Sequence, residues 1–569
     1  MIYRKKTPVT NNDFTRRWDA AAGLFLLPSG GKGHTPDCFG QENLHSLPDS
    51  VSFMTYAAIT GRLDEIDCPG ILENISRCQF REAEKRGLIK WFLEDRDQTD
   101  GNAPFFICIG LIPLRKYFAG ELGVGSCRLI DGILSEALHY FMHKCEGWGC
   151  FYPNSFLGDA VFAWLINEMC GDGKNDVKLL NVLDGSARYW IEEGWGWGEH
   201  MSDIYAMVCN YEISMLLLMS DRLPDETRKL YMEALRQLVG IEEHFGGRPR
   251  VPVIRSYSFV ETPKAYPFRQ AIRDWRPDEE VTIGNLPPMG PLLKRLGWHE
   301  MAPPPAAPQK EIEVPCFNGA KATAFIEKDF RIGAMSRYPV MDCCDNQSWG
   351  LSWQSFPAAF LHDDGDWGFL QWAAVEDGNT YAHPSHKKNF SRLKGLTAKV
   401  NPPIAGNTFS LRNGGNLLVL RRMPSISGAW TKLTDRLRVI SPTAVFNEQK
   451  ISGNTSTMSF KWKERTLSVA RVTLSPLPVH RNAHVEDGIL DWDIEYGTSA
   501  VQSISGAVVL WAFCTDAIIE EAPVIKPDEL KKRPSGIENG VFDLKWNAGN
   551  AVWNLKINPV SDSPYQTIN

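Results

Sequence analysis

The segment that divides this chain reads Met301-Ala-Pro-Pro-Pro-Ala-Ala-Pro-Gln-Lys310. Proline lacks an amide N–H and its ring fixes φ, so a run this rich in proline continues neither a helix nor a central strand. The 569 residues of the chain also exceed the size of about 250–300 residues at which a single core usually stops growing. We therefore expect one domain over residues 1–300, a proline-rich linker over 301–311 and a second domain over 312–569.

The residues before the linker carry a helical pattern. Apolar side chains recur at helical spacing in successive stretches that are separated by connectors rich in Gly and Trp. These stretches lie at roughly 50–62, 71–94, 105–121, 128–144, 157–170, 176–192, 202–219 and 225–243. Repeated helical hairpins predict helix pairs stacked around an axis, so we expect the first domain to be an α/α toroid or part of one.

The residues after the linker carry the alternating pattern of β-strands. Ala322–Glu327 and Arg331–Met335 predict a hairpin around Lys328-Asp329. Further strands are expected at Phe409–Leu411, Leu417–Arg421, Leu437–Ile440, Met458–Trp462, Leu467–Val472, Ile489–Glu495, Ala507–Phe513 and Val552–Ile557. Val, Thr, Trp and Phe with frequent turn residues indicate an antiparallel β-sandwich. The predicted fold is thus an all-α domain followed by an all-β domain.

Composition sets limits on partners and location. Lys+Arg 61 against Asp+Glu 68 gives a net charge of −7, so we expect no nucleic-acid partner. No apolar run of about 18 residues appears, so we expect no membrane-spanning helix. No apolar stretch follows the basic start, which predicts a cytoplasmic protein as the sequence stands, or a secreted or periplasmic one if a signal was trimmed. The 13 cysteines form no CxxC pair, and we expect neither a metal nor a cofactor.

The densest group of reactive side chains is Trp195-Gly-Trp-Gly-Glu-His-Met-Ser-Asp-Ile-Tyr205. Ser202 is a favourable N-cap, so we expect a helix to begin there, with His200 in the connector and Tyr205 in the first turn. Tyr211 lies about three turns away from His200 along that helix. We therefore favour Tyr205 over Tyr211 as the proton-transfer partner of His200. The alternative is a capping-region histidine with two core tyrosines.

Aromatic and acidic neighbours extend this group. The 19 Trp residues are an unusually large number, which suits either large cores or stacking surfaces for ring-shaped ligands. Trp195 and Trp197 stand in a Gly-flanked connector, where we expect a sugar-stacking wall. Glu199 and Tyr211 are expected to be further substrate-binding residues.

A second segment supplies positive charge. Gly246-Gly-Arg-Pro-Arg-Val-Pro-Val-Ile-Arg-Ser-Tyr257 contains two prolines and two glycines, which predicts a rigid loop. Its guanidinium groups, among them Arg250 and Arg255, suit bidentate binding of a carboxylate or sulfate. Tyr257 follows Arg255 in the same loop. The alternative is a set of surface arginines paired with local acids.

Two loop-to-helix junctions supply amide and acid side chains. Asn154 and Asp159 lie in Phe151-Tyr-Pro-Asn-Ser-Phe-Leu-Gly-Asp159, and Asn102 lies in a similar junction. Helix capping is the simplest role for Asn154 and Asp159, and Asn102 is a weaker candidate for the site. We keep Asn154 as a candidate for binding a substrate carboxylate.

A polar loop of the expected β domain holds His383 and His386. His383 is expected to bind substrate if the two domains pack face to face. With Asp342, Asp345 or Asp366 these histidines could instead hold a metal, although the spacing is generic.

A helical-hairpin toroid, a linker and an antiparallel sandwich resemble the polysaccharide lyases of the heparinase II/III, alginate lyase and chondroitin AC lyase type. The resemblance covers nearly the whole chain in architecture. It implies a toroid site of Asn, His, Tyr and Arg, and here Asn154, His200, Tyr205 and Arg255 occur in that order. The Asn-Asn-His signature of several of these families is absent, and Glu199 precedes His200. Tyr257 matches the alginate-lyase arrangement, so two tyrosines compete for one role.

The reaction implied by the resemblance is β-elimination from a uronic-acid-containing glycan. It needs neutralisation of the uronate carboxylate, which Arg255 and Asn154 can supply, and a proton shuttle from His200 and a tyrosine. A glycoside hydrolase is a second hypothesis, with Glu199, Asp203 and Asp159 as acids. A cytosolic dehydratase, isomerase or cyclase is a third, and a carbohydrate-binding protein without catalysis is the fourth.

Overall fold

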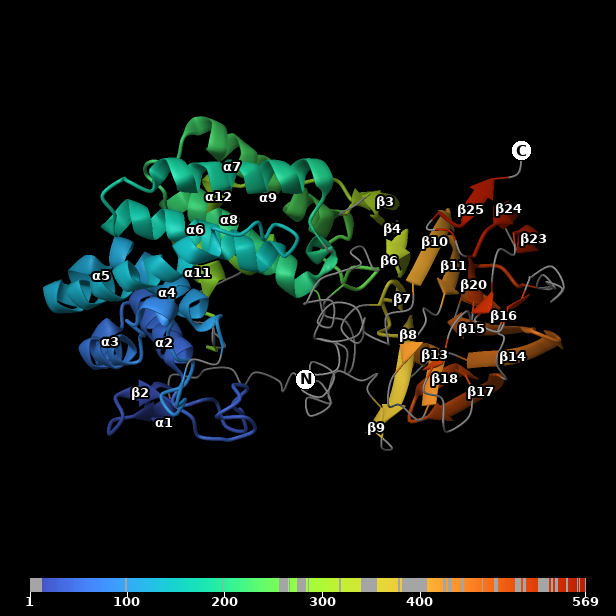
Figure 1. Ribbon diagram of the computed structural model, residues 1–569, viewed down its shortest axis with the longest axis horizontal. Coiled ribbons are helices and arrows are strands. Elements are labelled where there is room, and N and C mark those ends of the chain that lie inside the picture. The colour runs from blue at the N-terminus through green and yellow to red at the C-terminus, as the bar shows by residue number, and fades with distance from the viewer. Residues whose placement is uncertain are drawn as a thin grey trace.

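The computed structural model describes two regions, a helical one followed by one of antiparallel strands (Figure 1). The residues described are 13–97, 100–196, 198–254, 265, 267–273, 283–284, 286–316, 319–338, 356–376, 379–380, 407–422, 426–427, 432–441, 445–462, 464–474, 479–496, 503–504, 508–519, 532–533, 536–537, 541–548, 551–559, 561 and 563–567. The expected order of helices and then antiparallel strands is confirmed.

Helices occupy most of the first region. They are α1 (Asp13–Arg17), α2 (Leu47–Thr60), α3 (Cys68–Arg77), α4 (Ala103–Tyr117), α5 (Ala119–Lys144), α6 (Pro153–Cys170), α7 (Asp176–Glu193), α8 (Asp203–Met219), α9 (Asp225–His244), α10 (Phe268–Arg273), α11 (Met289–Arg295) and α12 (Trp298–Met301), with 3-10 turns η1 (Leu63–Glu65), η2 (Ala83–Lys85) and η3 (Glu199–Met201). Among the described residues, no helix is both long and apolar enough to cross a membrane.

Five of these helices make a closed cycle of contacts. Helix α2 packs on α4, α4 on α6, α6 on α8, and the short helix α11 contacts both α8 and α2. Arg295 helps to close the cycle, because its guanidinium donates to the carbonyls of Ala58 and Ile59 at the end of α2. The cycle brings the N-terminal and C-terminal parts of the helical region together.

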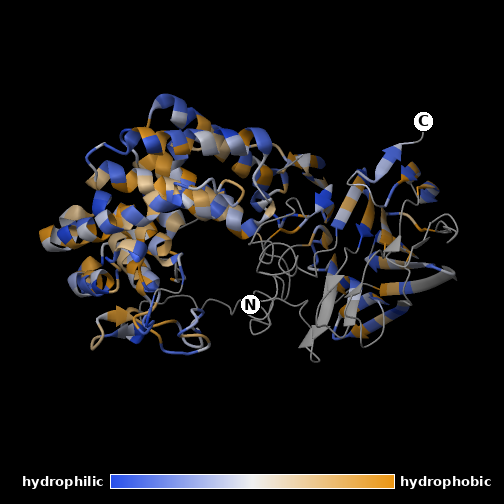
Figure 2. Cartoon of the chain, in the orientation of Figure 1, coloured by the Kyte–Doolittle hydropathy of each residue, from blue (hydrophilic) through white to orange (hydrophobic). Residues whose placement is uncertain are grey.

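Helices α3, α5, α7 and α9 form an outer layer over this cycle. In α7 and α9 one side is buried and the other is exposed, and Figure 2 shows hydrophobic and hydrophilic residues alternating along them. In α6 every residue from Phe156 to Asn167 is buried, as expected of a helix surrounded by others. The burial patterns therefore separate an inner layer from an outer layer.

Most of the second region is β-strand. The strands are β3 (Glu311–Pro315), β4 (Lys321–Ile326), β5 (Phe330–Met335), β6 (Arg337–Tyr338), β7 (Ala358–His362), β8 (Trp367–Glu376), β9 (Asn379–Thr380), β10 (Asn407–Asn413), β11 (Asn416–Arg422), β12 (Ile426–Ser427), β13 (Lys432–Ile440), β14 (Val445–Ser452), β15 (Thr455–Trp462), β16 (Arg465–Leu474), β17 (Val479–Glu486), β18 (Ile489–Tyr496), β19 (Ser503–Ile504), β20 (Val508–Thr515), β21 (Lys532–Arg533), β22 (Gly536–Ile537), β23 (Phe542–Ala548), β24 (Ala551–Ile557) and β25 (Tyr565–Thr567). Two short strands, β1 (Trp18–Asp19) and β2 (Leu24–Phe25), pair within the helical region.

Two large sheets share one core. One has the strand order β14-β15-β16-β20-β11-β10-β6, and the other runs β17-β18-β13-β8-β7-β5-β4-β3. A single buried cluster contains Val419 and Trp511 of the first sheet and Phe360 and Trp492 of the second, so the sheets pack face to face. The expected hairpin is present as β4 and β5. A smaller sheet, β23-β24-β25, packs on the far side of the first.

The helical and β regions are in direct contact. Helix α12 ends at Met301 and strand β3 begins at Glu311. A buried cluster then joins Met201 and Ile254 from the helical side to Met335 and Trp367 from the strands. A backbone bridge between Val253 and Phe356 adds to this contact. The residues that follow α7 and α9 are therefore packed against the β-strands.

Candidate functional site

Helices α4, α6 and α8 run in the same direction. Their C-terminal halves line one cavity, to which they contribute Ile112, Leu165 and Met219. Nearer their N-terminal ends a Cβ on Gly158 would lie 2.5 Å from Phe105 and 2.8 Å from Glu212, so this glycine permits close packing of the three helices. The N-terminal ends therefore lie at one end of the helical region, where helix dipoles favour negative charge.

We call this end the N-terminal rim and define it by Asn102, Asn154 and Tyr205. Asn102 is the residue before α4, and Asn154 and Tyr205 lie in the first turns of α6 and α8. Asn102 is exposed, whereas Asn154 and Tyr205 are half-buried. The rim thus presents two amide side chains and one phenol that a ligand can reach.

Asn154 is held by Glu199 from the turn η3. The Glu199 carboxylate accepts hydrogen bonds from the Asn154 backbone N–H at 2.9 Å and from its Nδ2 at 2.5 Å. Glu199 is fully buried. Since an amide nitrogen carries two hydrogens, one donor of Asn154 remains for a ligand. Glu199, expected to bind substrate, instead fixes the orientation of Asn154.

Two more buried carboxyl groups lie behind Glu199. Burial raises the pKa of Glu212 well above its usual range, and the charges of Glu199 and Asp159 raise it further. Burial also raises the pKa of Asp159 to about 7. Among the described residues, neither carboxyl oxygen of Glu212 has a hydrogen-bond partner. We therefore expect Glu212 to be protonated at neutral pH.

This arrangement predicts how stability depends on pH. The pKa of Glu212 is higher in the folded state than its value of about 4.5 in the unfolded chain. The folded state therefore loses stability relative to the unfolded state as the pH rises from about 4.5 to the raised pKa. Glu212→Gln cannot ionise, so we expect it to be more stable than the parent at neutral pH, by a margin that vanishes near pH 4.5. Urea unfolding at a series of pH values measures the margin. Glu192→Gln, at an exposed position, is the control. If the stability difference between Glu212→Gln and the parent did not change with pH, Glu212 would not be protonated in the folded state.

His200 lies in the interior. Its side chain is fully buried, and Nε2 lies 3.6 Å from the Sγ of Cys316, just after β3. Burial and the nearby Arg250 lower the pKa of His200 to about 3, which the backbone of Trp195 only partly opposes. Burial also raises the pKa of Cys316 to about 12. His200 is therefore a weak base beside a neutral thiol, and we leave it out of the proposed proton shuttle.

Three other expected substrate residues also lie in the interior. Trp195 is 2% exposed and stacks on Trp190, with ring centroids 5.3 Å apart. Tyr211 is buried edge-on against Phe268. In this arrangement neither ring offers a face to a sugar. The third residue is Arg250.

Arg250 is buried between two acids. Its guanidinium lies 3.8 Å from Asp203 and 3.9 Å from Glu242, and it donates to the Ser202 carbonyl at 3.1 Å. Burial raises the pKa of Asp203 to about 6, although Arg250 opposes the rise. Arg250 therefore has a structural environment. Four other expected site residues, Trp197, Arg255, Tyr257 and His383, lie outside the described residues.

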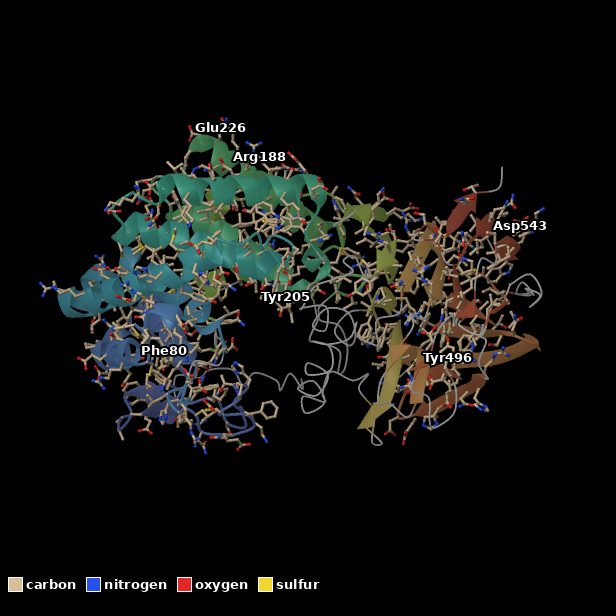
Figure 3. The ribbon with its side chains drawn as sticks, in the orientation of Figure 1. Phe80, Arg188, Tyr205, Glu226, Tyr496 and Asp543 are labelled. Atoms are coloured by element: carbon tan, nitrogen blue, oxygen red, sulfur yellow. The ribbon has the colours of Figure 1, made fainter. Side chains whose placement is uncertain are left out.

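Tyr205, like Asn154, is an expected catalytic residue that is only half-buried. Ser202 caps α8 by accepting a hydrogen bond from the Tyr205 N–H at 3.3 Å, as predicted. Figure 3 shows Tyr205 at the edge of the helical region, on the side of the β-strands. A capped first turn fixes the backbone of this tyrosine and leaves its phenol half-buried.

The structure adds a histidine–aspartate pair beside Asn102. His34 Nε2 lies 3.2 Å from the Asp100 carboxylate, and its ring meets Trp91 edge-on at 4.4 Å. Although burial opposes it, hydrogen bonds from His34 and the Asn102 backbone lower the pKa of Asp100. Both side chains remain partly exposed. The signal in the sequence was weak, because a single histidine in a Gly-rich stretch matches no motif.

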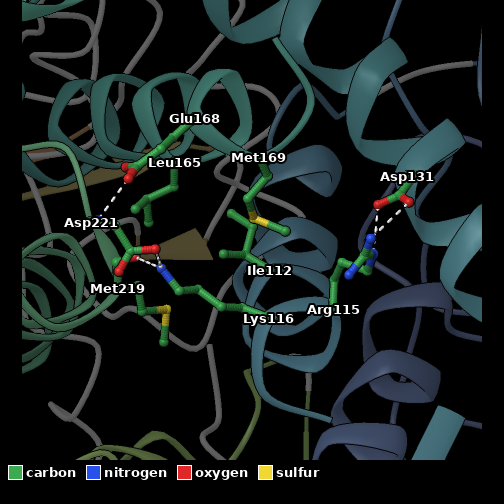
Figure 4. A pocket seen from close by; sticks show the side chains of 9 residues that line it. All are labelled: Ile112, Arg115, Lys116, Asp131, Leu165, Glu168, Met169, Met219 and Asp221. Atoms are coloured by element: carbon green, nitrogen blue, oxygen red, sulfur yellow. Dashed lines mark hydrogen bonds and ion pairs between the residues drawn. The ribbon is translucent and has the colours of Figure 1, made fainter. Parts of the chain in front are cut away.

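The cavity at the opposite end of α4, α6 and α8 has a volume of about 240 Å³ (Figure 4). Arg115 pairs with Asp131, and Lys116 pairs with Asp221. Glu168 accepts hydrogen bonds from the backbone after α8. The charged groups that line the cavity therefore have partners, either in ion pairs or on the backbone.

The metal hypothesis gains no support from the described residues. His383, His386, Asp342 and Asp345 lie outside them, and Asp366 accepts a hydrogen bond from the Trp462 indole at 2.6 Å. Within the described part of the chain, no group of three His, Cys, Asp or Glu side chains is arranged to hold a metal ion.

The protein thus consists of a helical region with a polar rim at its helix N-termini, followed by an antiparallel β region. No protein-family model and no curated protein sequence matches the chain. The solved structures similar to the chain include a crystal structure of heparinase III, 12% identical with a TM-score of 0.37, which covers 81% of this chain and 76% of that one. They also include a heparinase III gene product, 11% identical with a TM-score of 0.33, with coverages of 90% and 84%.

Proposed function

We propose that this protein is a carbon–oxygen lyase that cleaves a uronic-acid-containing glycan by β-elimination. In this proposal the closed cycle of helices is an α/α toroid over residues 1–300, joined by 301–311 to the β domain. The observation that carries it is the rim, where Asn154 is fixed by Glu199 while Tyr205 remains accessible. An amide donor and a proton shuttle are two groups that this elimination requires.

The carboxylate of the substrate is the first requirement. Asn154 would donate its remaining amide hydrogen to the uronate, and the N-terminal ends of α4, α6 and α8 favour the negative charge. Neutralising the carboxylate acidifies the proton on C5 of the uronate ring. Arg255 would bind the same carboxylate as a second ligand, as predicted from the sequence.

Proton transfer is the second requirement. Tyr205 as phenolate would accept the C5 proton, and the electron pair left on C5 would form the C4=C5 double bond while the C4–O bond breaks. Tyr205 would then return its proton to the departing oxygen, so the reaction consumes no water and no cofactor. His34, held by Asp100, is the second candidate for the acceptor.

A panel of uronate polymers with neutral polysaccharides as controls tests the proposal. Elimination creates a conjugated double bond, so ultraviolet absorbance should rise when the protein is incubated with uronate polymers and should not rise with neutral polysaccharides. Mass spectrometry of the products separates elimination from hydrolysis, because hydrolysis adds one water to the products. Saturated products with new reducing ends would replace the lyase by the hydrolase, and no products across the panel would favour the carbohydrate-binding protein.

A further inference from the structure

Trp148 is the most exposed large aromatic side chain among the described residues, at 57%. It stands between Gly147 and Gly149 in the connector from α5 to α6. An indole exposed to water forgoes the burial that usually stabilises it. A ligand that covers the ring would recover that contribution.

The protein holds this indole in place. Its ring meets Tyr189 of α7 nearly perpendicularly, at 5.6 Å between centroids, and lies 6.3 Å from Phe156 of α6. A Cβ on Gly185 would lie 3.6 Å from the indole, so Trp148 rests against the backbone of α7 at this glycine. The connector itself is tied to α7, since the Trp190 indole donates to the Cys150 carbonyl at 2.8 Å. A ring with fixed neighbours loses little conformational entropy when it binds a ligand.

Charged side chains of both signs, among them two exposed lysines, lie near Trp148. Lys144 and Lys178 are both exposed. Burial raises the pKa of Cys145 to about 12, and the charges of these two lysines partly oppose the rise. Glu146 is the acid beside them, at 3.3 Å from Lys178 and 3.3 Å from His143. Asp184 beside Gly185 and Glu193 near Tyr189 are further acids of this region. The exposed ammonium groups of Lys144 and Lys178 are the groups here that can attract an anionic ligand.

The position of Trp148 connects it with the rim. Its connector leads directly into α6, in whose first turn Asn154 lies. A chain-like ligand that reaches Asn154 can therefore continue outward over α7. We propose that Trp148 and Tyr189 form a stacking subsite for a pyranose ring of an anionic glycan, with Lys144 and Lys178 as its charged flank. This inference rests on the proposed function for its choice of ligand.

Binding measured without turnover tests the subsite. The Tyr205→Phe variant provides the background, and calorimetry compares uronate disaccharides with long uronate chains from the same panel. Adding Trp148→Ala should weaken binding of the long chains about tenfold, a loss of about 1.4 kcal/mol, and leave the disaccharides unchanged. Val177→Ala is the matched control, because it removes an exposed apolar side chain elsewhere, on α7, that is 73% exposed.

The outcomes separate this inference from the proposed function. Equal affinities of the Trp148→Ala and Val177→Ala variants for long chains would overturn the subsite, as would a background variant that binds no member of the panel. A Trp148-dependent affinity in a protein that forms no unsaturated products would support the subsite and overturn the lyase. Added salt should weaken binding of the long chains, because the lysine flank is exposed to solvent.

Discussion

Replacing Tyr205 with phenylalanine is expected to lower kcat on a uronate substrate by about 10²–10⁴-fold, the usual contribution of a positioned acid–base group. The substitution removes one hydroxyl from a half-buried side chain whose backbone is fixed by the Ser202 cap. The fold should therefore be retained. Initial rates of ultraviolet absorbance, with circular dichroism as the check on folding, measure the effect.

Tyr211→Phe is the matched control for this prediction. Tyr211 lies on the same helix and loses the same hydroxyl, but it is buried against Phe268. Its substitution should leave kcat within about twofold, since it touches no solvent-accessible part of the rim. Equal losses in both variants would remove Tyr205 from the reaction, and a loss confined to His34→Gln would assign proton transfer to the second candidate.

Much of the fold followed from local patterns. Apolar spacing before Met301 and alternation after Glu311 predicted the order of helices and strands, because both patterns record which faces are buried. The closing contact of α11 with α2 and α8 was not predicted. This helix has seven residues, and its partners lie far away in the chain, so no local pattern announces the contact.

The candidate site was less predictable, and the glycines before His200 explain why. Gly194, Gly196 and Gly198 have φ values of 88°, 52° and 105°, which favour glycine. A Cβ on Gly194 would lie 2.6 Å from the Pro315 carbonyl oxygen, so the connector turns inward against β3. His200 and Trp195 are thereby buried. A Gly-rich connector is predicted from sequence to be exposed. Here it is buried because it packs against β3, which lies after the linker.

Pairings across the chain were also beyond the sequence. The types of Asn154 and Glu199 marked both as candidates, but their contact joins residues 45 positions apart. Asp100 and His34 are 66 positions apart, and neither stands in a motif. Residue type suggests a chemistry, whereas its partner depends on how the helices are arranged. The geometry of the site therefore depends on helix directions and on hydrogen bonds between distant residues.

Replacing Arg250 with methionine is expected to destabilise the folded chain by about 3–5 kcal/mol, the usual cost of leaving a buried charge without its partner. Arg250 is 3% exposed and lies between Asp203 and Glu242. Methionine fills much of the same volume but removes the guanidinium that both acids share, and the charge of Arg331 then acts on Asp203 alone. Urea unfolding at neutral pH measures the loss.

A surface pair provides the comparison for Arg250. Arg236 pairs with Glu233 on α9 with its side chain 58% exposed, and Arg236→Met should change stability by less than about 1 kcal/mol. Adding Asp203→Asn to Arg250→Met should recover part of the loss, because one uncompensated acid is removed. A substrate-binding Arg250 would behave differently, with stability retained and KM raised. Because Arg250 is buried, we expect a loss of stability and not a change in KM. In the proposed reaction Arg255, and not Arg250, would therefore bind the substrate carboxylate.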